Sequence, residues 1–138
     1  MNMASDRTTN PIKVFISHSQ SDKQWVREFA ELLEKSGIDV WLDDVEIAVG
    51  EPIADKLTEA LRSSSSLVLV FGPQSTQTPW LFFELGMALS LGKRVIAVVG
   101  RDVSVKELPE PIRERRYLLM ESPQETAREV AEALTKTG

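Results

Sequence analysis

Residues 67–99 of the chain read LVLVFGPQSTQTPWLFFELGMALSLGKRVIAVV, in which two wholly apolar runs flank a segment of helical length. The runs at 67–71 and 95–99 contain no polar residue, which is typical of strands buried on both faces of a sheet. Two parallel strands need a long crossover between them, and that crossover is usually a helix. The stretch therefore predicts a strand–helix–strand unit of a parallel sheet.

The rest of the chain continues this alternation of strands and helices. β-rich runs predict further strands over residues 12–17, 38–42 and 116–120, and the strand that ends the quoted stretch covers 94–99. Helical spacing of apolar residues predicts helices over 21–36, 53–61, 79–91 and 127–134, while 100–115 reads mostly as loop. The pattern favours an α/β fold, a flavodoxin-like three-layer sandwich whose five-stranded parallel sheet has the order 2-1-3-4-5, with helices on both faces.

Residues that favour helix starts and ends occur at the expected helix boundaries. A hydroxyl residue before the first turn can cap a helix, proline is favoured at the first helical position, and glycine ends a helix because it tolerates positive φ. Such signals occur at Ser21 with Gln24, at Gly37, at Thr78 with Pro79, and at Ser122 with Pro123 and Glu125.

Length and composition limit the function classes. A chain of 138 residues can form one domain with a substantial core. A net charge of −5 without a dense basic run argues against direct nucleic-acid binding. No apolar run is long enough to span a bilayer, and residues 1–10 lack the apolar segment of a secretory signal, so we expect no membrane contact and a cytoplasmic location. Residues 1–10 are predicted to be a disordered tail, and residues 11–138 to form the domain.

His18 is the single histidine, and the chain has no cysteine. Disulfides, thiolate metal sites and His-rich zinc sites are therefore excluded. A Ser-His-Asp triad would have to use His18, but its neighbours Ser17 and Ser19 point elsewhere if the segment is extended. We set triad chemistry aside and expect no bound metal.

Glu84 is the only charged residue between Pro79 and Gly92. Ligands of such sheets bind beyond the carboxyl ends of the strands, between the first and third strands, and Glu84 lies close enough to its helix start to reach that crevice. A salt bridge to a loop or a side chain facing water would be the simpler interpretations. A lone acid in an apolar helix nevertheless favours a functional carboxylate. Its neighbours three and four positions away are the apolar residues Trp80, Leu81, Met87 and Ala88.

Several motifs, in order along the chain, resemble those of bacterial-type Toll/interleukin-1 receptor (TIR) domains. Residues 13–53 read KVFISHSQSDKQWVREFAELLEKSGIDVWLDDVEIAVGEPI, with Phe-Ile-Ser ending the first strand, Ser-x-x-Asp before the first helix, and Val-Trp-Leu-Asp further on. The loop with Glu46 and Gly50, and the Trp80-x-x-x-Glu84 pattern, complete the set. Each motif is weak alone, but the ordered set is specific and covers residues 11–136.

The resemblance implies an activity as well as a fold. Many TIR domains cleave NAD between nicotinamide and ribose, and the resemblance places their catalytic glutamate at Glu84 and the matching aromatic residue at Trp80. Nicotinamide leaves as a neutral molecule, so no general acid is needed, unlike in ordinary glycoside hydrolysis. A carboxylate in an apolar pocket would stabilise the positive ribose. NAD is then the substrate, and we expect no cofactor.

The candidate substrate-binding residues lie in loops at the same edge of the sheet. Where some NAD-cleaving TIR domains have a basic residue, this chain has Ser19 and Gln20, so backbone amides, hydroxyls, Lys23 or a second protomer would have to meet the phosphates. Val45 stands where this group often has a second tryptophan. Asp43 and Asp44 would shape their loop or meet ribose hydroxyls, and a divalent metal is the weaker alternative there. The candidates are Trp80, Ser17, His18, Ser19, Asp44 and Gly50.

The loop at residues 43–52 carries two further predictions. It is long for a connection in an α/β fold and contains Gly50 as a candidate hinge, so we expect it to move and to gate the crevice. Its apolar residues Ile47 and Val49, with Ile53, favour contact with a second molecule. TIR domains commonly self-associate, so we expect NAD cleavage to depend on assembly into a homo-oligomer or filament.

Three hypotheses remain. The first is a TIR-domain NAD glycohydrolase that releases nicotinamide and ADP-ribose, or a cyclic form of it. The second is a non-catalytic TIR interaction module that signals through TIR–TIR contacts. The third is an enzyme resembling nucleoside deoxyribosyltransferases, which would act on nucleosides in place of NAD. A phospho-receiver domain is disfavoured, because it needs acidic residues where the first strand here ends in Ser17 and His18.

Overall fold

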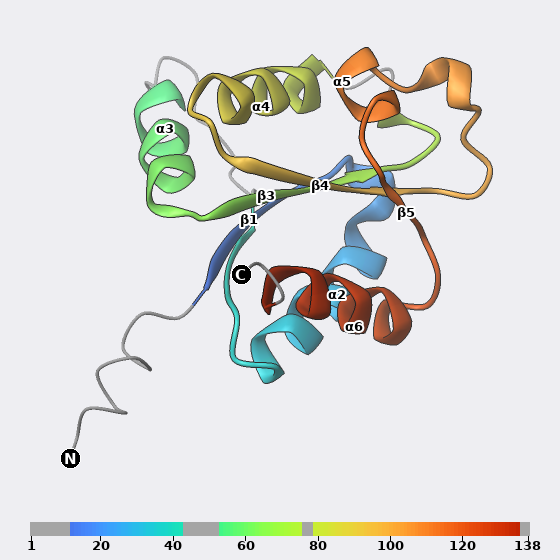
Figure 1. The fold of residues 1–138 in the computed structure, drawn as a ribbon, viewed down its shortest axis with the longest axis horizontal. Helices are drawn as coiled ribbons and strands as arrows, with labels where there is room; N and C mark the ends of the chain where they lie inside the picture. Colours follow the sequence, from blue (N-terminus) through green and yellow to red (C-terminus); the bar gives the residue numbers. More distant parts are fainter. Residues whose placement is uncertain (1–11, 43–52, 76–78, 136–138) are drawn as a thin grey trace.

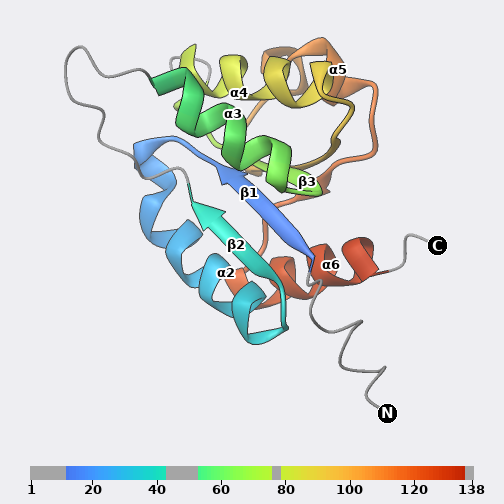
Figure 2. The same cartoon turned by 90° about the vertical axis from the view of Figure 1, so that its left-hand side faces the viewer.

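The computed structural model describes residues 12–42, 53–75 and 79–135. Five strands form one sheet of order β2-β1-β3-β4-β5, and all neighbouring strands are parallel (Figures 1 and 2). This confirms the predicted flavodoxin-like sheet and its order. The strands are β1 (Lys13–Ser17), β2 (Asp39–Leu42), β3 (Ser66–Phe71), β4 (Arg94–Val99) and β5 (Leu118–Leu119).

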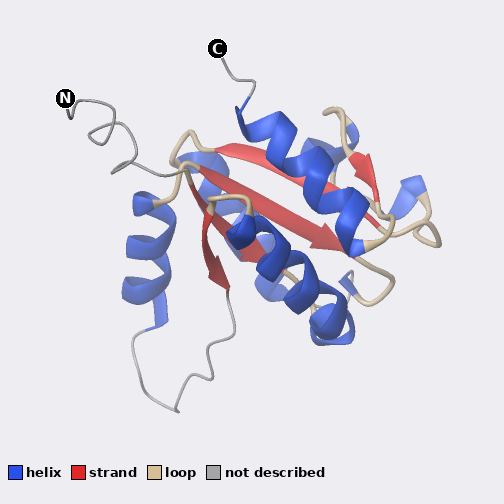
Figure 3. Cartoon of the chain, turned by 90° about the horizontal axis from the view of Figure 1, so that it is seen from below, coloured by secondary structure: helices blue, strands red, loops and turns tan. Residues whose placement is uncertain are grey.

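Helices cover both faces of the sheet (Figure 3). On one face lie α2 (Lys23–Lys35) and α6 (Pro123–Thr135), and on the other lie α3 (Ile53–Ser63), α4 (Pro79–Ser90) and the short α5 (Glu110–Arg113) (Figure 1). Two short 3-10 turns, η1 (Gln20–Asp22) and η3 (Val105–Glu107), complete the described elements. In this described part of the chain, no helix is both long and apolar enough to cross a membrane.

Successive side chains of a strand point to opposite faces of the sheet, and this alternation decides which helices they contact. In β1, Val14 and Ile16 belong to the core cluster with residues of α2 and α6, whereas Phe15 packs in the cluster that contains residues of α3 and α4. Ser17 is two residues beyond Phe15 and therefore points to the α4 face of the sheet. All six residues of β3 are buried, as its apolar sequence predicted.

Most predicted boundaries agree with the structure. Gly37 ends α2 with a φ of +88°, and α4 begins at Pro79. The Ser122 hydroxyl accepts a hydrogen bond from the Glu125 backbone N–H at 3.1 Å and so caps α6. Thr78, the predicted cap of α4, lies outside the described residues.

Two predictions about local structure were wrong. The capping box of Ser21 and Gln24 does not form, because η1 precedes α2 and places Asp22 at the helix cap without a side-chain cap bond. The predicted strand at 116–120 is reduced to residues 118–119, since it is an edge strand that pairs only with the end of β4. The preceding segment is also more ordered than expected: η3 begins with a capping box between Ser104 and Glu107, and α5 follows.

Candidate active site

The carboxyl ends of β1 and β3 meet at the point where the sheet order reverses, which is where ligands of this fold class bind. Ser17 and Leu69 are register partners there, so the loop after β1 and the turn after β3 lie side by side. The loop after β1 contains the half-buried His18 and the buried Ser19. The turn after β3 leads toward α4, which carries Glu84.

Glu84 is completely buried, with 0% of its surface exposed. It occupies a core position of α4, because Leu81, Leu85 and Ala88 lie on the same helical stripe and are buried as well. This excludes the simpler interpretation of a side chain facing water. An ionised carboxylate is costly to bury, so its position requires polar partners or a functional reason.

The Ser17 hydroxyl donates a hydrogen bond to Oε1 of Glu84. Ser17 is also fully buried, and the two residues are 67 positions apart in the chain. The bond therefore connects the end of β1 to the second turn of α4 and fixes the orientation of the carboxylate. Sequence reasoning placed Ser17 among substrate-binding groups; the structure shows that it contacts Glu84.

Asp22 is a second acid near this edge and was not among the predicted site residues. Its Oδ2 accepts a hydrogen bond from the Ser19 hydroxyl at 3.1 Å, and Ser19 also shares a 3.0 Å hydrogen bond with the Ser21 hydroxyl. The Asp22 carboxylate packs on Gly72, where an added Cβ would lie 2.4 Å from Oδ2. The Ser-x-x-Asp motif thus connects the loop after β1 to the turn after β3. The spacing of serine and aspartate in this motif was the sequence feature that could have predicted the contact.

Burial raises the pKa of Asp22 above its ordinary value. The hydrogen bond from Ser19 and the nearby His18 oppose this rise in the pKa, whereas the negative charge of Asp102 adds to it. His18 follows β1 and Asp102 follows β4, so the loops after two strands contribute charges around this carboxylate. The edge of the sheet therefore has acidic groups at two depths, Glu84 in the core and Asp22 nearer the surface.

The turn after β3 is held by its own hydrogen bonds. The Gly72 N–H donates to the Ser75 hydroxyl at 2.9 Å, and the Ser75 N–H donates to the Gly72 carbonyl at 3.0 Å. Ser75 is completely buried. Buried hydroxyls from Ser17, Ser19 and Ser75 therefore surround the switch point, and each has a hydrogen-bond partner within the protein.

The remaining predicted residues are only partly placed. Trp80 lies in the first turn of α4, one turn before Glu84, and its side chain is outside the description. Asp44 and Gly50 also lie outside the described residues, as do Asp43, Val45, Glu46, Ile47 and Val49, so the predictions on the 43–52 loop are untested. Among the residues that are described, no group of three His, Asp or Glu side chains is placed to hold a metal ion.

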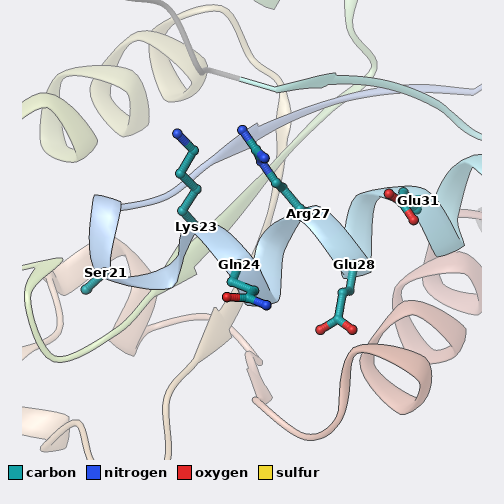
Figure 4. A pocket seen from close by; sticks show the side chains of 6 residues that line it. All are labelled: Ser21, Lys23, Gln24, Arg27, Glu28 and Glu31. Atoms are coloured by element: carbon teal, nitrogen blue, oxygen red, sulfur yellow. The ribbon is translucent and has the colours of Figure 1, made fainter.

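A surface groove of about 670 Å³ runs along the start of α2 (Figure 4). Lys23, one of the alternatives named for contact with the phosphates, lines it, and neither Ser17 nor Glu84 is among its lining residues. Lys23 and Arg27 extend from the same side of the helix in Figure 4. The groove is lined by Ser21, Lys23, Gln24, Arg27, Glu28 and Glu31.

The chain belongs to the TIR domain family, whose model matches residues 14–136. It is 27% identical over 104 residues to the 2′ cyclic ADP-D-ribose synthase BtTIR of Bacteroides thetaiotaomicron, covering 72% of this chain and 36% of the relative. It is 29% identical over 99 residues to the NAD(+) hydrolase TcpA of a Theionarchaea archaeon, covering 69% of this chain and 30% of the relative. The chain thus spans about a third of the length of these relatives.

Solved TIR structures have the same fold. The TIR domain of the Toll-related receptor TRR-2 from Hydra magnipapillata superposes with a TM-score of 0.68 at 20% identity, covering 88% of this chain and 93% of that one. One chain of the heterodimer of the RPS4 and RRS1 TIR domains superposes with a TM-score of 0.67 at 15% identity, covering 92% of this chain and 97% of that one. At such identities the likeness concerns the fold alone.

Proposed function

We propose that this TIR domain cleaves NAD at the nicotinamide–ribose bond, with Glu84 as the catalytic residue. The observation that carries the proposal is the fully buried carboxylate of Glu84 near the carboxyl ends of the strands, which is oriented by the Ser17 hydroxyl at the end of β1. The names of two relatives, a 2′ cyclic ADP-D-ribose synthase and an NAD(+) hydrolase, support NAD as the substrate.

The proposed chemistry requires one carboxylate. When the bond breaks, its electron pair moves to the positively charged nicotinamide ring, which leaves neutral, and the positive charge develops on the ribose. Glu84 would stabilise that charge in surroundings where water does not weaken the interaction. Attack by water then gives ADP-ribose and a proton, and attack by a hydroxyl of the same molecule gives a cyclic product and a proton.

Ser17 acts in this mechanism as a positioning residue. Its bond to Oε1 holds the carboxylate in one orientation before the substrate arrives, which avoids the cost of reorganisation during the reaction. Contacts of NAD with His18, Ser19, Trp80, Asp44 and Gly50 stay predictions. Ser19 already donates to Asp22, so it would meet the substrate only if this bond is shared or broken.

The second candidate function is an interaction module without enzymatic activity. The RPS4 and RRS1 TIR domains form a heterodimer in their crystal structure, which supports other TIR domains as partners of this chain. Assembly is compatible with catalysis as well as with pure signalling. We propose that the domain self-associates and acts in the cytoplasm in either case.

The test is to incubate concentrated protein with NAD and to measure released nicotinamide, linear ADP-ribose and cyclic products by chromatography. Glu84→Gln should lower the rate by at least about 100-fold, because the charge that stabilises the ribose is lost. The matched control is Glu59→Gln, which removes an exposed carboxylate from α3 on the same side of the sheet and should keep the parent rate.

The same assay separates the three hypotheses. Parallel incubations with nucleosides and free base would reveal a deoxyribosyltransferase-like activity. Nicotinamide release by the parent but not by Glu84→Gln supports the proposal. Equal rates for these two proteins would contradict the assignment of Glu84, and no turnover of any substrate by concentrated protein would favour the interaction module.

A further inference from the structure

Asp22 occupies a position where a helix cap is expected, but its carboxylate does not cap the helix. It immediately precedes α2, and an aspartate there usually accepts a hydrogen bond from a backbone N–H of the first helical turn. The Asp22 side chain makes no such bond. Its Oδ2 accepts the Ser19 hydroxyl at 3.1 Å, and the carboxylate lies against Gly72, directly after β3. The side chain thus makes a contact between distant segments in place of a local one.

This placement is unfavourable for the stability of the fold in two ways. A capping side chain stabilises the start of a helix, and α2 lacks that contribution from Asp22. Burial and the negative charge of Asp102 both raise the pKa of Asp22, so an ionised carboxylate is disfavoured between these loops. Departures of this kind from the local preference of a residue are expected at functional sites.

The two segments that Asp22 connects lie side by side at the switch point near Glu84. Ser17, whose hydroxyl donates to Oε1 of Glu84, is two residues before Ser19. Gly72 begins the turn that leads toward α4, the helix that carries Glu84. β1 ends at Ser17, so the loop leaves the sheet beyond this residue. The contacts of Asp22 then connect the loop to the turn.

We propose that Asp22 is a positioning residue for the cleavage of NAD and acts by fixing the Ser17 hydroxyl that orients Glu84. This role rests on the proposed function, because it concerns the same carboxylate. The Asp22 carboxylate holds Ser19 against the turn after β3, and this restricts the directions in which the Ser17 hydroxyl can point. Asp22 needs no contact with the substrate in this role.

A positioning residue has a different kinetic signature from a substrate-binding residue. Glu84 stabilises a charge that develops only in the transition state, so a misdirected carboxylate lowers kcat and leaves KM nearly unchanged. Loss of a group that binds the substrate raises KM instead. The separate effects on kcat and KM therefore distinguish positioning from binding.

The first experiment measures steady-state nicotinamide release by the full chain and its variants. Asp22→Ala should lower kcat about 10-fold, with KM for NAD within about 2-fold of the parent value. Gly72→Ala should have a similar effect, because its Cβ displaces the same carboxylate from the other side. Asp22→Asn keeps the size of the side chain and an oxygen that accepts the Ser19 hydroxyl, so it should recover most of the rate.

The matched control is Ser122→Ala, which removes a side chain that does cap its helix. The Ser122 hydroxyl accepts the Glu125 N–H at 3.1 Å at the start of α6, on the opposite face of the sheet from α4 (Figure 1). This variant should lose stability to a similar degree and keep the parent kcat. Urea denaturation compares the stabilities, and circular dichroism confirms that the variants are folded.

A double-variant cycle tests whether Asp22 acts through Ser17. Once Ser17→Ala has removed the hydroxyl, Asp22→Ala has no orientation left to disturb. The double variant should therefore have a kcat within about 2-fold of Ser17→Ala alone. The positioning role is overturned if the two losses multiply, if Asp22→Ala raises KM without lowering kcat or keeps the parent kcat, or if Ser122→Ala loses as much kcat.

Hydrogen exchange separates this inference from the proposed function, because it needs no NAD. The Gly72 N–H donates to the Ser75 hydroxyl, and the Ser75 N–H donates to the Gly72 carbonyl, so both amides report on the turn after β3. Asp22→Ala should speed their exchange about 10-fold, whereas Ser122→Ala should not. Unchanged exchange in Asp22→Ala overturns the connection between the two segments. A parent that releases no nicotinamide, with faster exchange in Asp22→Ala, contradicts the proposed function and leaves that connection supported.

Discussion

Helices α2 and α4 lie on opposite faces of one sheet and bury their side chains in different ways. α2 has an apolar stripe with Val26, Phe29 and Leu33 completely buried, and charged residues cover its exposed face. α4 reverses this arrangement: its single acid, Glu84, is in the buried stripe, and two phenylalanines are on the exposed face. A departure from amphipathic order on a well-packed helix therefore indicates a function, because stability alone would not select it.

Substitutions at the centre of each buried stripe should differ strongly in their effect on stability. Phe29→Ala in α2 should lower the free energy of unfolding by about 3–5 kcal/mol, since it leaves a cavity under a ring that also stacks on Trp25. Glu84→Gln in α4 should change it by less than about 1 kcal/mol, because glutamine keeps the shape and an acceptor for Ser17. Urea denaturation of both variants measures the difference, and a similar large loss for both would contradict a functional origin of Glu84.

Ser17→Ala should reduce NAD cleavage by about 10- to 100-fold, because the carboxylate loses the donor that orients it. Ser64 is a matched control: it is also buried, and its hydroxyl donates one hydrogen bond, to the Ala60 carbonyl at 2.7 Å, but it lies at the amino end of β3. Ser64→Ala should cost a similar amount of stability, about 1 kcal/mol, without changing the rate. Equal rates for the two variants would show that Ser17 has no positioning role.

Alanine substitutions at two glycines test the difference between the crowded switch point and the open outer face of α4. Gly72→Ala should destabilise the fold by about 1–2 kcal/mol, because its Cβ forces the Asp22 carboxylate away from Ser19. Gly86→Ala should stabilise by about 0.5–1 kcal/mol, since alanine favours the helix and meets nothing there. A double variant of Gly72→Ala with Asp22→Ala should recover part of the loss; strictly additive effects would mean that the two residues do not interact.

The smallest expected effect is on the pH dependence of stability. The pKa of Asp22 is raised in the folded protein by burial, so the folded state keeps this proton to higher pH than the unfolded state does. The contribution of Asp22 is therefore present below its ordinary pKa of 3.8 and is lost as pH rises through the raised value. Relative to Asp22→Asn, the parent should lose stability from about pH 4 upward. Denaturation midpoints of both proteins between pH 4 and 7 would show this, and parallel curves would contradict it.

Much of the fold followed from periodicities that are local in the chain. The apolar strands β3 and β4, the amphipathic helix α2 and the glycine that ends it are all visible as patterns within about 15 residues. Glu84 was found in the same way, as the one charge in an apolar run. The start of α2 and the length of β5 were not predicted correctly, because they depend on contacts with other segments: the hydroxyl and carboxylate bonds of η1, and the pairing with β4.

The sequence alone was enough for the order of the main strands and helices, the class of sheet and the identity of the unusual acid, because these follow from the spacing of apolar residues along the backbone. The contacts of Glu84 could not be predicted in the same way. Ser17 reaches Glu84 across 67 residues, and Asp22 reaches Gly72, only because the sheet order places β1 beside β3 and the strand period turns Ser17 toward α4. Contacts between distant segments depend on the packing of the whole sheet, which no local pattern records.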